Sequence, residues 1–197
     1  MNIEEVRLNY ARWEKRLRPI LRFLFPTKVY GMENFVDQPC LICINHSNFY
    51  DPLLIALAFG GHRVIHFMAK AELFRNKRFG ALLESVGAFG VDRDGADISA
   101  VRTVMKYIRN GEIVGIFPEG TRVDTDGAVE AKAGAVRMAA KLRVPIVPVY
   151  LSRKKRLFRT SKIVIGEALY VPADAVDYRA ATNDLMNRIS ELGRSVI

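Results

Sequence analysis

The chain has 197 residues, of which 50% are hydrophobic and 26% are charged, and this balance indicates a globular protein and excludes a disordered or collagen-like chain. A chain of this length buries roughly 70% of the surface of its unfolded form, so it needs neither metals nor disulfides for stability. Its 30 Lys and Arg against 21 Asp and Glu give a net charge of +9. This charge favours partners that carry phosphate: nucleic acid, an anionic membrane surface or a phosphorylated substrate.

The first 25 residues predict amphipathic helices. Apolar side chains recur at steps of three and four residues, as on one face of an α-helix, at Ile3, Val6, Tyr10, Trp13, Leu17, Ile20 and Leu24. Pro19 interrupts this pattern, and because an interior proline kinks or breaks a helix, we expect two short helices. Their exposed arginines and neighbouring aromatic residues suit the headgroup layer of an anionic membrane. Packing of the apolar face on the chain's own domain is an equally good explanation.

No segment reaches the roughly 18–20 apolar residues that are needed to cross a bilayer. The charged residues near the start, such as Glu4, Glu5 and Arg7, are not compatible with the apolar centre of a signal peptide. We therefore expect a cytoplasmic protein that meets a membrane only peripherally, on its cytoplasmic face.

From residue 26 onward, short β-branched runs alternate with helical patterns, which predicts an α/β architecture in one domain over 26–197. The expected strands are 29–31, 40–44, 64–69, 88–91, 113–116, 146–151 and 163–165. The expected helices are 52–59, 79–86, 96–108, 133–142 and 178–192.

The residue types that bind metals are sparse and poorly spaced. Cys40 and Cys43 fall in one predicted strand, where residues three apart point to opposite faces, so we expect two buried thiols in a reducing compartment. A thioredoxin-like motif opens a helix, and a zinc knuckle needs a second cysteine pair. His62 and His66 lie on or before a strand, where residues four apart are too distant to share one ion. We expect no metal.

The loop after the second predicted strand, residues 45–51, carries a histidine and an aspartate. Histidine is the side chain most often used as a general base, so His46 can take a proton from a hydroxyl group. Asp51, about one helical turn further on, can bond the other ring nitrogen and fix the tautomer. No motif exposes a serine or cysteine nucleophile, so the attacking hydroxyl belongs to the substrate. The alternative for Asp51 is an N-cap of the following helix.

A second polar loop, Phe117-Pro118-Glu119-Gly120-Thr121-Arg122, directly follows the predicted strand 113–116. Gly120 permits close approach of the backbone, Thr121 offers a hydroxyl and Arg122 presents paired donors that match phosphate oxygens. The loop is typical of an anion site, although a turn with a solvated arginine would have the same composition.

Four segments in order resemble the conserved blocks of the glycerolipid acyltransferase family, and most closely its lysophosphatidic acid acyltransferases. They are Asn45-His46 through Asp51, Gly87 through Arg93, Phe117 through Arg122, and Val144 through Val149, and they cover roughly residues 28–152. The resemblance implies a glycerol-phosphate acyltransferase-like fold, with a central mixed sheet flanked by helices and an N-terminal two-helix motif over residues 1–25 that serves as a membrane-surface anchor.

The same resemblance implies acyl transfer from acyl-CoA or an acyl-acyl-carrier-protein to the sn-2 hydroxyl of lysophosphatidic acid, with no other cofactor. His46 would be the general base and Asp51 would hold and polarise it. The acceptor's glycerol phosphate would be bound by Arg93, Glu119, Gly120, Thr121 and Arg122. Lys70, after the third predicted strand, would add positive charge near the site. The family's lysine-glycine element appears at Lys132 and Gly134, for which the start of a surface helix is the alternative.

The stretch Arg153 to Arg159 is basic and aromatic, and it suits docking on anionic lipid or on an acidic carrier protein. A solvated hairpin is the alternative.

Four other functions are compatible with parts of the pattern: acylation of glycerol 3-phosphate, acylation of another lysophospholipid, thioester hydrolysis, and lipid binding without catalysis. Acceptor-dependent release of the thiol separates a transferase from a thioesterase. Nucleic-acid binding is suggested by charge alone, without any motif, so we expect no nucleic-acid partner.

Overall fold

The computed structural model describes residues 3–59, 63–91, 98–174 and 177–196. Its strands are β1 (Thr27–Tyr30), β2 (Leu41–Ile44), β3 (Ile65–Lys70), β4 (Phe89–Val91), β5 (Ile113–Ile116), β6 (Ile146–Leu151) and β7 (Ser161–Ile165). Its α-helices are α1 (Ile3–Leu24), α2 (Asp51–Ala58), α3 (Lys77–Ser85), α4 (Ile98–Arg109), α5 (Gly134–Leu142) and α6 (Tyr178–Arg194), and two short 3₁₀ helices cover Met32–Asn34 and Ala71–Phe74.

The seven strands form one mixed sheet in the order β1-β7-β6-β2-β5-β3-β4. Five neighbouring strands, from β6 to β4, run parallel to one another. β7 is antiparallel to β6, and β1 is parallel to β7. In the parallel part, all carboxyl ends of the strands lie at one edge of the sheet, where α/β proteins place their ligand sites.

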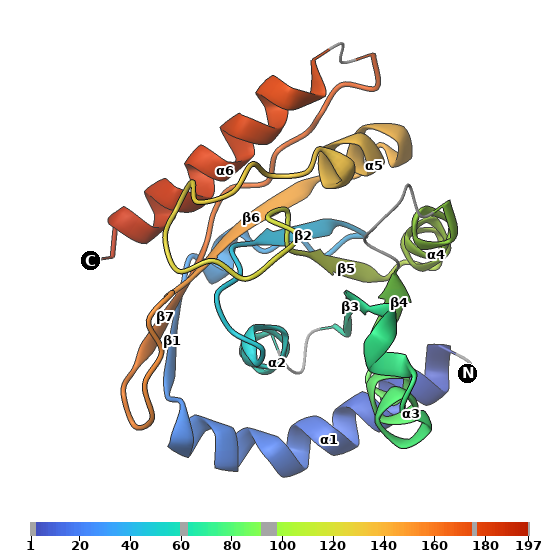
Figure 1. The fold of residues 1–197 in the computed structure, drawn as a ribbon, viewed down its shortest axis with the longest axis vertical. Coiled ribbons are helices and arrows are strands. Elements are labelled where there is room, and N and C mark those ends of the chain that lie inside the picture. The colour runs from blue at the N-terminus through green and yellow to red at the C-terminus, as the bar shows by residue number, and fades with distance from the viewer. Residues whose placement is uncertain (1–2, 60–62, 92–97, 175–176, 197) are drawn as a thin grey trace.

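Helices cover both faces of the sheet (Figure 1). On one face, α4, α5 and α6 pack against a core that includes Leu41, Cys43 and Val114. On the other face, α2 packs against a core that includes Cys40, Ile42 and Phe67. Figure 1 shows α1 and α3 further out on this second side. Every residue of the central strands β2 and β5 is buried, as expected for parallel strands covered on both faces.

The predicted α/β architecture is confirmed, and each predicted strand and helix of residues 26–197 has a counterpart. The strands 113–116 and 146–151 agree at both ends, and each of the other strands differs by one or two residues at one or both ends. Cys40 and Cys43 are free, buried and in cores on opposite faces of the sheet, as the alternation of a strand predicts. Burial raises the pKa of the Cys40 thiol to about 12, so this thiol is not a nucleophile at neutral pH.

The prediction of two N-terminal helices is wrong, because α1 is one continuous helix of 22 residues that contains Pro19. Proline removes one hydrogen bond from a helix. Pro19 is exposed, so the carbonyl group that loses its partner reaches water. Packing of the segment before the proline holds the helix against the domain: Val6 and Tyr10 are buried, and the Tyr10 hydroxyl donates to the carbonyl of Ala56 on α2 (2.8 Å).

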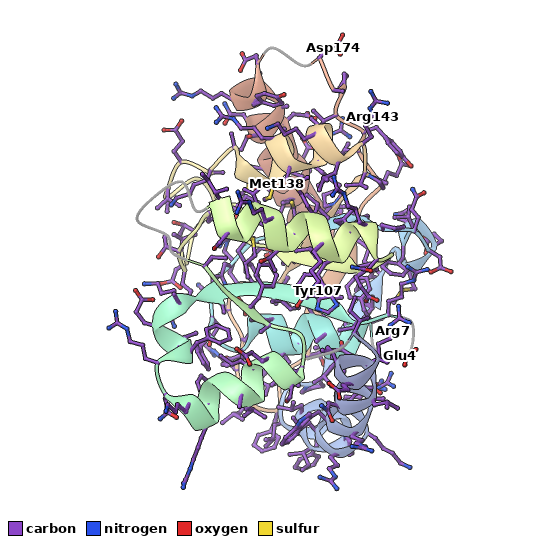
Figure 2. The ribbon with its side chains drawn as sticks, turned by 90° about the vertical axis from the view of Figure 1, so that its right-hand side faces the viewer. Glu4, Arg7, Tyr107, Met138, Arg143 and Asp174 are labelled. Carbon is purple, nitrogen blue, oxygen red and sulfur yellow. The ribbon has the colours of Figure 1, made fainter. Side chains whose placement is uncertain are left out.

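A polar cluster around the buried side chains of Glu112 and His66 ties the start of α1 to the sheet. Arg7 bonds Glu112 Oε1 (2.5 Å), and Glu112 Oε2 lies 3.2 Å from His66 Nε2 on β3. The His66 ring stacks on Tyr107 of α4 with a centroid distance of 3.8 Å. Figure 2 shows Arg7 near the start of α1 and Tyr107 above it on α4. These contacts account for His66 as a structural residue, whereas His62 lies outside the described residues.

Within the described ranges, none of the helices combines the length and the hydropathy that a bilayer-spanning segment requires.

Candidate active site

The parallel sheet brings the two polar loops together. β2 pairs with β5 so that Cys43 lies opposite Ile116, and each strand then ends within one residue of this pair. The loop with His46 follows β2, and the loop from Phe117 to Arg122 follows β5. The backbone N–H of Val123 donates to the carbonyl of His46 (2.9 Å), which joins the two loops directly.

His46 and Asp51 form the hydrogen-bonded pair that the sequence predicts. His46 Nδ1 lies 3.0 Å from Asp51 Oδ2, and the imidazole stacks on the Phe117 ring at a centroid distance of 4.1 Å. An ionised carboxylate can only accept hydrogen bonds, so the imidazole proton is assigned to Nδ1. Nε2 is then the basic nitrogen. The alternative of Asp51 as an N-cap is wrong: Tyr50 occupies that position, and the Asp51 carboxylate turns back to accept the N–H groups of Ser47 and Asn48, both at 2.7 Å.

The second oxygen of Asp51 faces a buried lysine. Lys155 Nζ lies 2.8 Å from Asp51 Oδ1, and neither side chain is exposed to solvent. Burial by itself raises the pKa of a carboxyl group, but the hydrogen bond from His46 and the charge of Lys155 together hold the pKa of Asp51 below its ordinary value. Burial lowers the pKa of Lys155, against the opposing effect of Asp51. Asp51 is therefore an ionised carboxylate at neutral pH.

Glu119 supports the histidine loop rather than facing solvent. It is 4% exposed, and its Oε2 accepts the backbone N–H of His46 at 2.5 Å. Its Oε1 accepts from Arg153 at 2.6 Å, and Arg153 also pairs with Asp126. Burial raises the pKa of Glu119 against the lowering effect of these donors. The sequence analysis places Glu119 with the acceptor-binding residues, whereas here both of its oxygens are engaged by the protein.

The other predicted acceptor-binding residues lie around the same edge of the sheet. Gly120 has a φ of +66°, and a side chain there would lie 3.2 Å from Lys132 Cε, so the turn requires glycine. Thr121 and Arg122 are exposed, and so is Lys70 at the end of β3. Arg93 lies outside the described residues.

An apolar cavity of about 450 Å³ opens beside His46. Its walls come from α1, α2, β3 and α3, and they include Tyr10, Trp13, Leu17, Leu53, Ala56, Leu57, Phe67, Met68, Phe79, Leu82, Leu83 and Val86. Arg122 and Lys70 also line the cavity, and because both are exposed they lie where it meets solvent. The cavity therefore combines an apolar interior with a lining that includes His46 and two exposed basic residues.

The sequence analysis missed Arg153 and Lys155 as parts of the site, and treated them as members of a solvated or docking stretch. Both follow β6, which pairs with β2 on the side opposite to β5. Arg153 and Lys155 point inward, while Lys154 between them is exposed. Their segment bends after the end of β6, so it has no strand alternation that could indicate this. Their place directly after a predicted strand, like that of the two polar loops, is the signal that would have pointed to them.

The fold is an α/β sheet with helices on both faces, and its site places a hydrogen-bonded histidine–aspartate pair beside an apolar cavity with exposed basic residues. The chain belongs to the acyltransferase family, whose sequence model matches residues 26–152.

It is 37% identical over 187 residues to the 1-acyl-sn-glycerol-3-phosphate acyltransferase of Bacillus subtilis, a match that covers 89% of this chain and 92% of that protein. It is 30% identical to a probable 1-acyl-sn-glycerol-3-phosphate acyltransferase of Mycoplasma pneumoniae over 175 residues, covering 79% of this chain and 65% of that protein.

The crystal structure of PlsC, the 1-acyl-sn-glycerophosphate acyltransferase of Thermotoga maritima, has the same fold, with a TM-score of 0.67 at 22% identity. The match covers 95% of this chain and 79% of that one.

Proposed function

We propose that the protein transfers a fatty acyl group from a thioester to the sn-2 hydroxyl of lysophosphatidic acid, which gives phosphatidic acid. The observation that carries the proposal is the His46–Asp51 pair beside an apolar cavity with exposed basic residues. The relatives named above, which share up to 37% of their residues with the chain, point to the same acceptor.

His46 Nε2 is the base in this reaction. It takes the proton of the acceptor hydroxyl as that oxygen attacks the thioester carbonyl carbon, and the proton then passes to the sulfur as the C–S bond breaks. Asp51 fixes the imidazole tautomer and stabilises the imidazolium that forms between these two steps. The acyl donor is acyl-CoA or an acyl-acyl-carrier-protein, and the thiol is the leaving group.

Arg122 and Lys70 bind the acceptor phosphate in this proposal, together with Thr121 and Arg93. A phosphate anchored by charge-assisted hydrogen bonds holds the hydroxyl of the same molecule at a fixed distance from His46, which lowers the entropic part of the barrier. Glu119 acts through the loop: it holds the His46 backbone and is itself held by Arg153.

The cavity holds the acyl chain. A volume of about 450 Å³ lined almost wholly by apolar side chains suits a flexible hydrocarbon, whose transfer from water is favourable by about 0.8 kcal/mol for each CH₂ group. α1 forms part of this wall, so the N-terminal segment is part of the substrate site and not only an attachment to a surface.

An exposed apolar patch at the end of α1 serves as the membrane contact. It consists of Phe23 on α1 with Leu157 and Phe158 on the β6–β7 connection, which are 72%, 55% and 62% exposed. The Phe23 and Phe158 rings meet at 5.4 Å, and Arg22, Arg156 and Arg159 are exposed around them. Arginines around apolar side chains favour an anionic surface such as the cytoplasmic leaflet.

Thiol release tests the reaction type. Purified protein is mixed with palmitoyl-CoA or with a palmitoyl-acyl-carrier-protein, each with and without lysophosphatidic acid, and phosphatidic acid is followed by mass spectrometry. We expect thiol release that depends on the acceptor and equals the phosphatidic acid formed. Thiol release without acceptor would identify a thioesterase, and release that follows glycerol 3-phosphate or lysophosphatidylcholine instead would reassign the acceptor.

A further inference from the structure

A lysine lies behind the His46–Asp51 pair, at a position that the proposed acyl transfer does not itself use. Lys155 Nζ lies 2.8 Å from Asp51 Oδ1, with no solvent exposure of either side chain. The same Nζ donates to Ser47 Oγ at 2.6 Å, and Ser47 Oγ in turn donates to the carbonyl of Arg153 at 3.0 Å. Lys155 is not among the described residues that line the cavity, so it does not meet the acyl chain.

The burial of the Lys155 ammonium group sets it apart from the other basic residues of the same segment. Lys154 and Arg156 on either side are exposed, as basic residues of a loop usually are. A buried ion pair contributes little net stability, because removing two charges from water costs about as much as their attraction returns. A buried ion pair does fix the geometry of its two side chains, because separating them would leave an unpaired charge in the protein interior.

The two oxygens of the Asp51 carboxylate have different partners. Oδ1 faces Lys155, while Oδ2 accepts from His46 Nδ1 and from the backbone of Ser47 and Asn48. With Oδ1 held by a cation, the carboxylate cannot rotate, and Oδ2 stays in line with the imidazole. Of the other charges nearby, Arg153 pairs with Glu119 and Asp126.

We propose that Lys155 is a positioning residue for the base: through Asp51 and Ser47 it fixes the carboxylate that holds His46 in its Nδ1–H tautomer. The proposal rests on the assignment of His46 as the base. It adds a third side chain to the pair, supplied by the segment after β6 rather than by either of the polar loops.

The tautomer can be measured without any substrate. In ¹⁵N-labelled protein, nitrogen–proton correlation spectra distinguish the two imidazole tautomers, and the His46→Ala variant assigns the His46 signals among the three histidines. We expect the Nδ1–H form in the wild type and a mixture of both forms in Lys155→Met. Lys141→Met, which removes an exposed lysine of α5, is the matched control and keeps the wild-type spectrum. An unchanged His46 tautomer in folded Lys155→Met would overturn the proposal.

Kinetics separate positioning from a general effect on folding. Lys155→Met is expected to lower kcat by about 10- to 100-fold, the range seen when an outer partner of a functional side chain is removed, with the KM for lysophosphatidic acid unchanged. In an Asp51→Asn background, the same substitution should change kcat less than twofold, because Lys155 acts through Asp51. The same loss in both backgrounds would show a merely structural role and contradict the proposal.

Circular dichroism shows whether Lys155→Met folds. If it does not, Ser47→Ala is a second variant that tests the role of Lys155. This variant retains both charges and removes the hydroxyl that anchors Nζ, so we expect a smaller tautomer shift and a loss of about 2- to 10-fold in kcat. A wild-type tautomer together with wild-type kcat would overturn the proposal here too. Failure of the wild type to make phosphatidic acid would instead contradict the proposed function, while the tautomer still decides the role of Lys155.

Discussion

Asp51 is the residue on which the site converges. Its carboxylate has no solvent exposure and contacts His46, Lys155 and two backbone N–H groups. A buried carboxylate with this number of donors stays ionised, and each donor is left unsatisfied if the charge is removed. The same side chain therefore contributes both to the stability of the loop and to the orientation of the base.

Asp51→Asn should reduce stability in a way that depends on pH. An amide presents one acceptor and one donor, so some of the surrounding donors lose their partner, and we expect a loss of about 3–5 kcal/mol in the free energy of unfolding near neutral pH. Because the folded-state pKa of Asp51 is lowered, its contribution is fully present above the unfolded pKa of about 3.9 and is lost as the pH falls through the folded value.

Urea titrations of both proteins between pH 7 and pH 3 measure this difference. The gap between wild type and Asp51→Asn should be largest at pH 5–7 and should shrink below about pH 4. A gap that stays constant over the whole range would show that the charge of Asp51 is not what stabilises the loop.

Arg122→Ala tests the phosphate contact. Loss of a charge-assisted hydrogen bond is worth about 1.5–3 kcal/mol, so kcat/KM for lysophosphatidic acid should fall by about 10- to 150-fold. Monoacylglycerol, which lacks the phosphate, provides the comparison: its much lower wild-type rate should be unaffected by the substitution. Equal losses with both acceptors would remove Arg122 from phosphate binding.

The residues of the site were predictable to different degrees. His46, Asp51 and Arg122 stand in short motifs at strand ends, where sequence alone signals chemistry. Lys155 stands in a basic run whose composition indicates solvent, and only the pairing of β6 with β2 turns it inward. The engagement of Glu119 by Arg153 depends in the same way on a contact across 34 residues.

At the scale of elements, α1 differs most from its prediction. Its apolar periodicity predicts a helical face correctly, but the effect of Pro19 depends on which side of the helix faces solvent, and the sequence does not reveal that. The central strands β2, β5 and β6 were predictable because continuous apolar runs of four to six residues are typical of buried strands. The sequence allowed α1 to pack on its own domain, but it did not reveal that α2 and α3 are the elements it contacts. That choice depends on contacts such as the one from Tyr10 to Ala56.

Trp13→Ala tests the assignment of α1 as a wall of the cavity. Removing the indole takes away about 1–2 kcal/mol of apolar contact with a long acyl chain, so kcat/KM for palmitoyl-CoA should fall by about 5- to 30-fold. Butyryl-CoA is too short to span the cavity and should be affected less than twofold. Leu8→Ala on the same helix is the control, because Leu8 is 60% exposed and does not line the cavity. Similar losses for both donors would mean that Trp13 does not touch the chain.

For the whole molecule, the sheet explains how distant segments meet. Three parallel strands, β6, β2 and β5, place Lys155, His46 and Arg122 at one edge although they come from separate parts of the sequence. The net charge of +9 was visible in the composition, but which charges remain exposed depends on this arrangement. Arg153 and Lys155 form ion pairs inside the protein. Arg22, Arg156 and Arg159 are exposed and can contact an anionic surface.

Membrane contact through the apolar patch predicts a specific loss of binding. Phe23→Glu with Phe158→Glu replaces the two contacting rings by like charges, which should lower sedimentation with vesicles of anionic phospholipid by about tenfold or more, because both apolar area and electrostatic attraction are lost. Ile98→Glu with Val101→Glu adds the same two charges on α4, where these side chains are 65% and 38% exposed, and should retain at least half of the binding. Equal losses from both proteins would indicate a general effect of charge.

The His46→Ala protein tests the central claim most directly. Phosphatidic acid formed from palmitoyl thioester and lysophosphatidic acid is measured for this variant and for wild type at equal concentration, with circular dichroism to establish that both are folded. The account predicts that the variant loses at least about 10²-fold in rate, as removal of a general base does, while the KM for the acceptor is retained. A folded His46→Ala protein that forms phosphatidic acid at close to the wild-type rate would contradict the account.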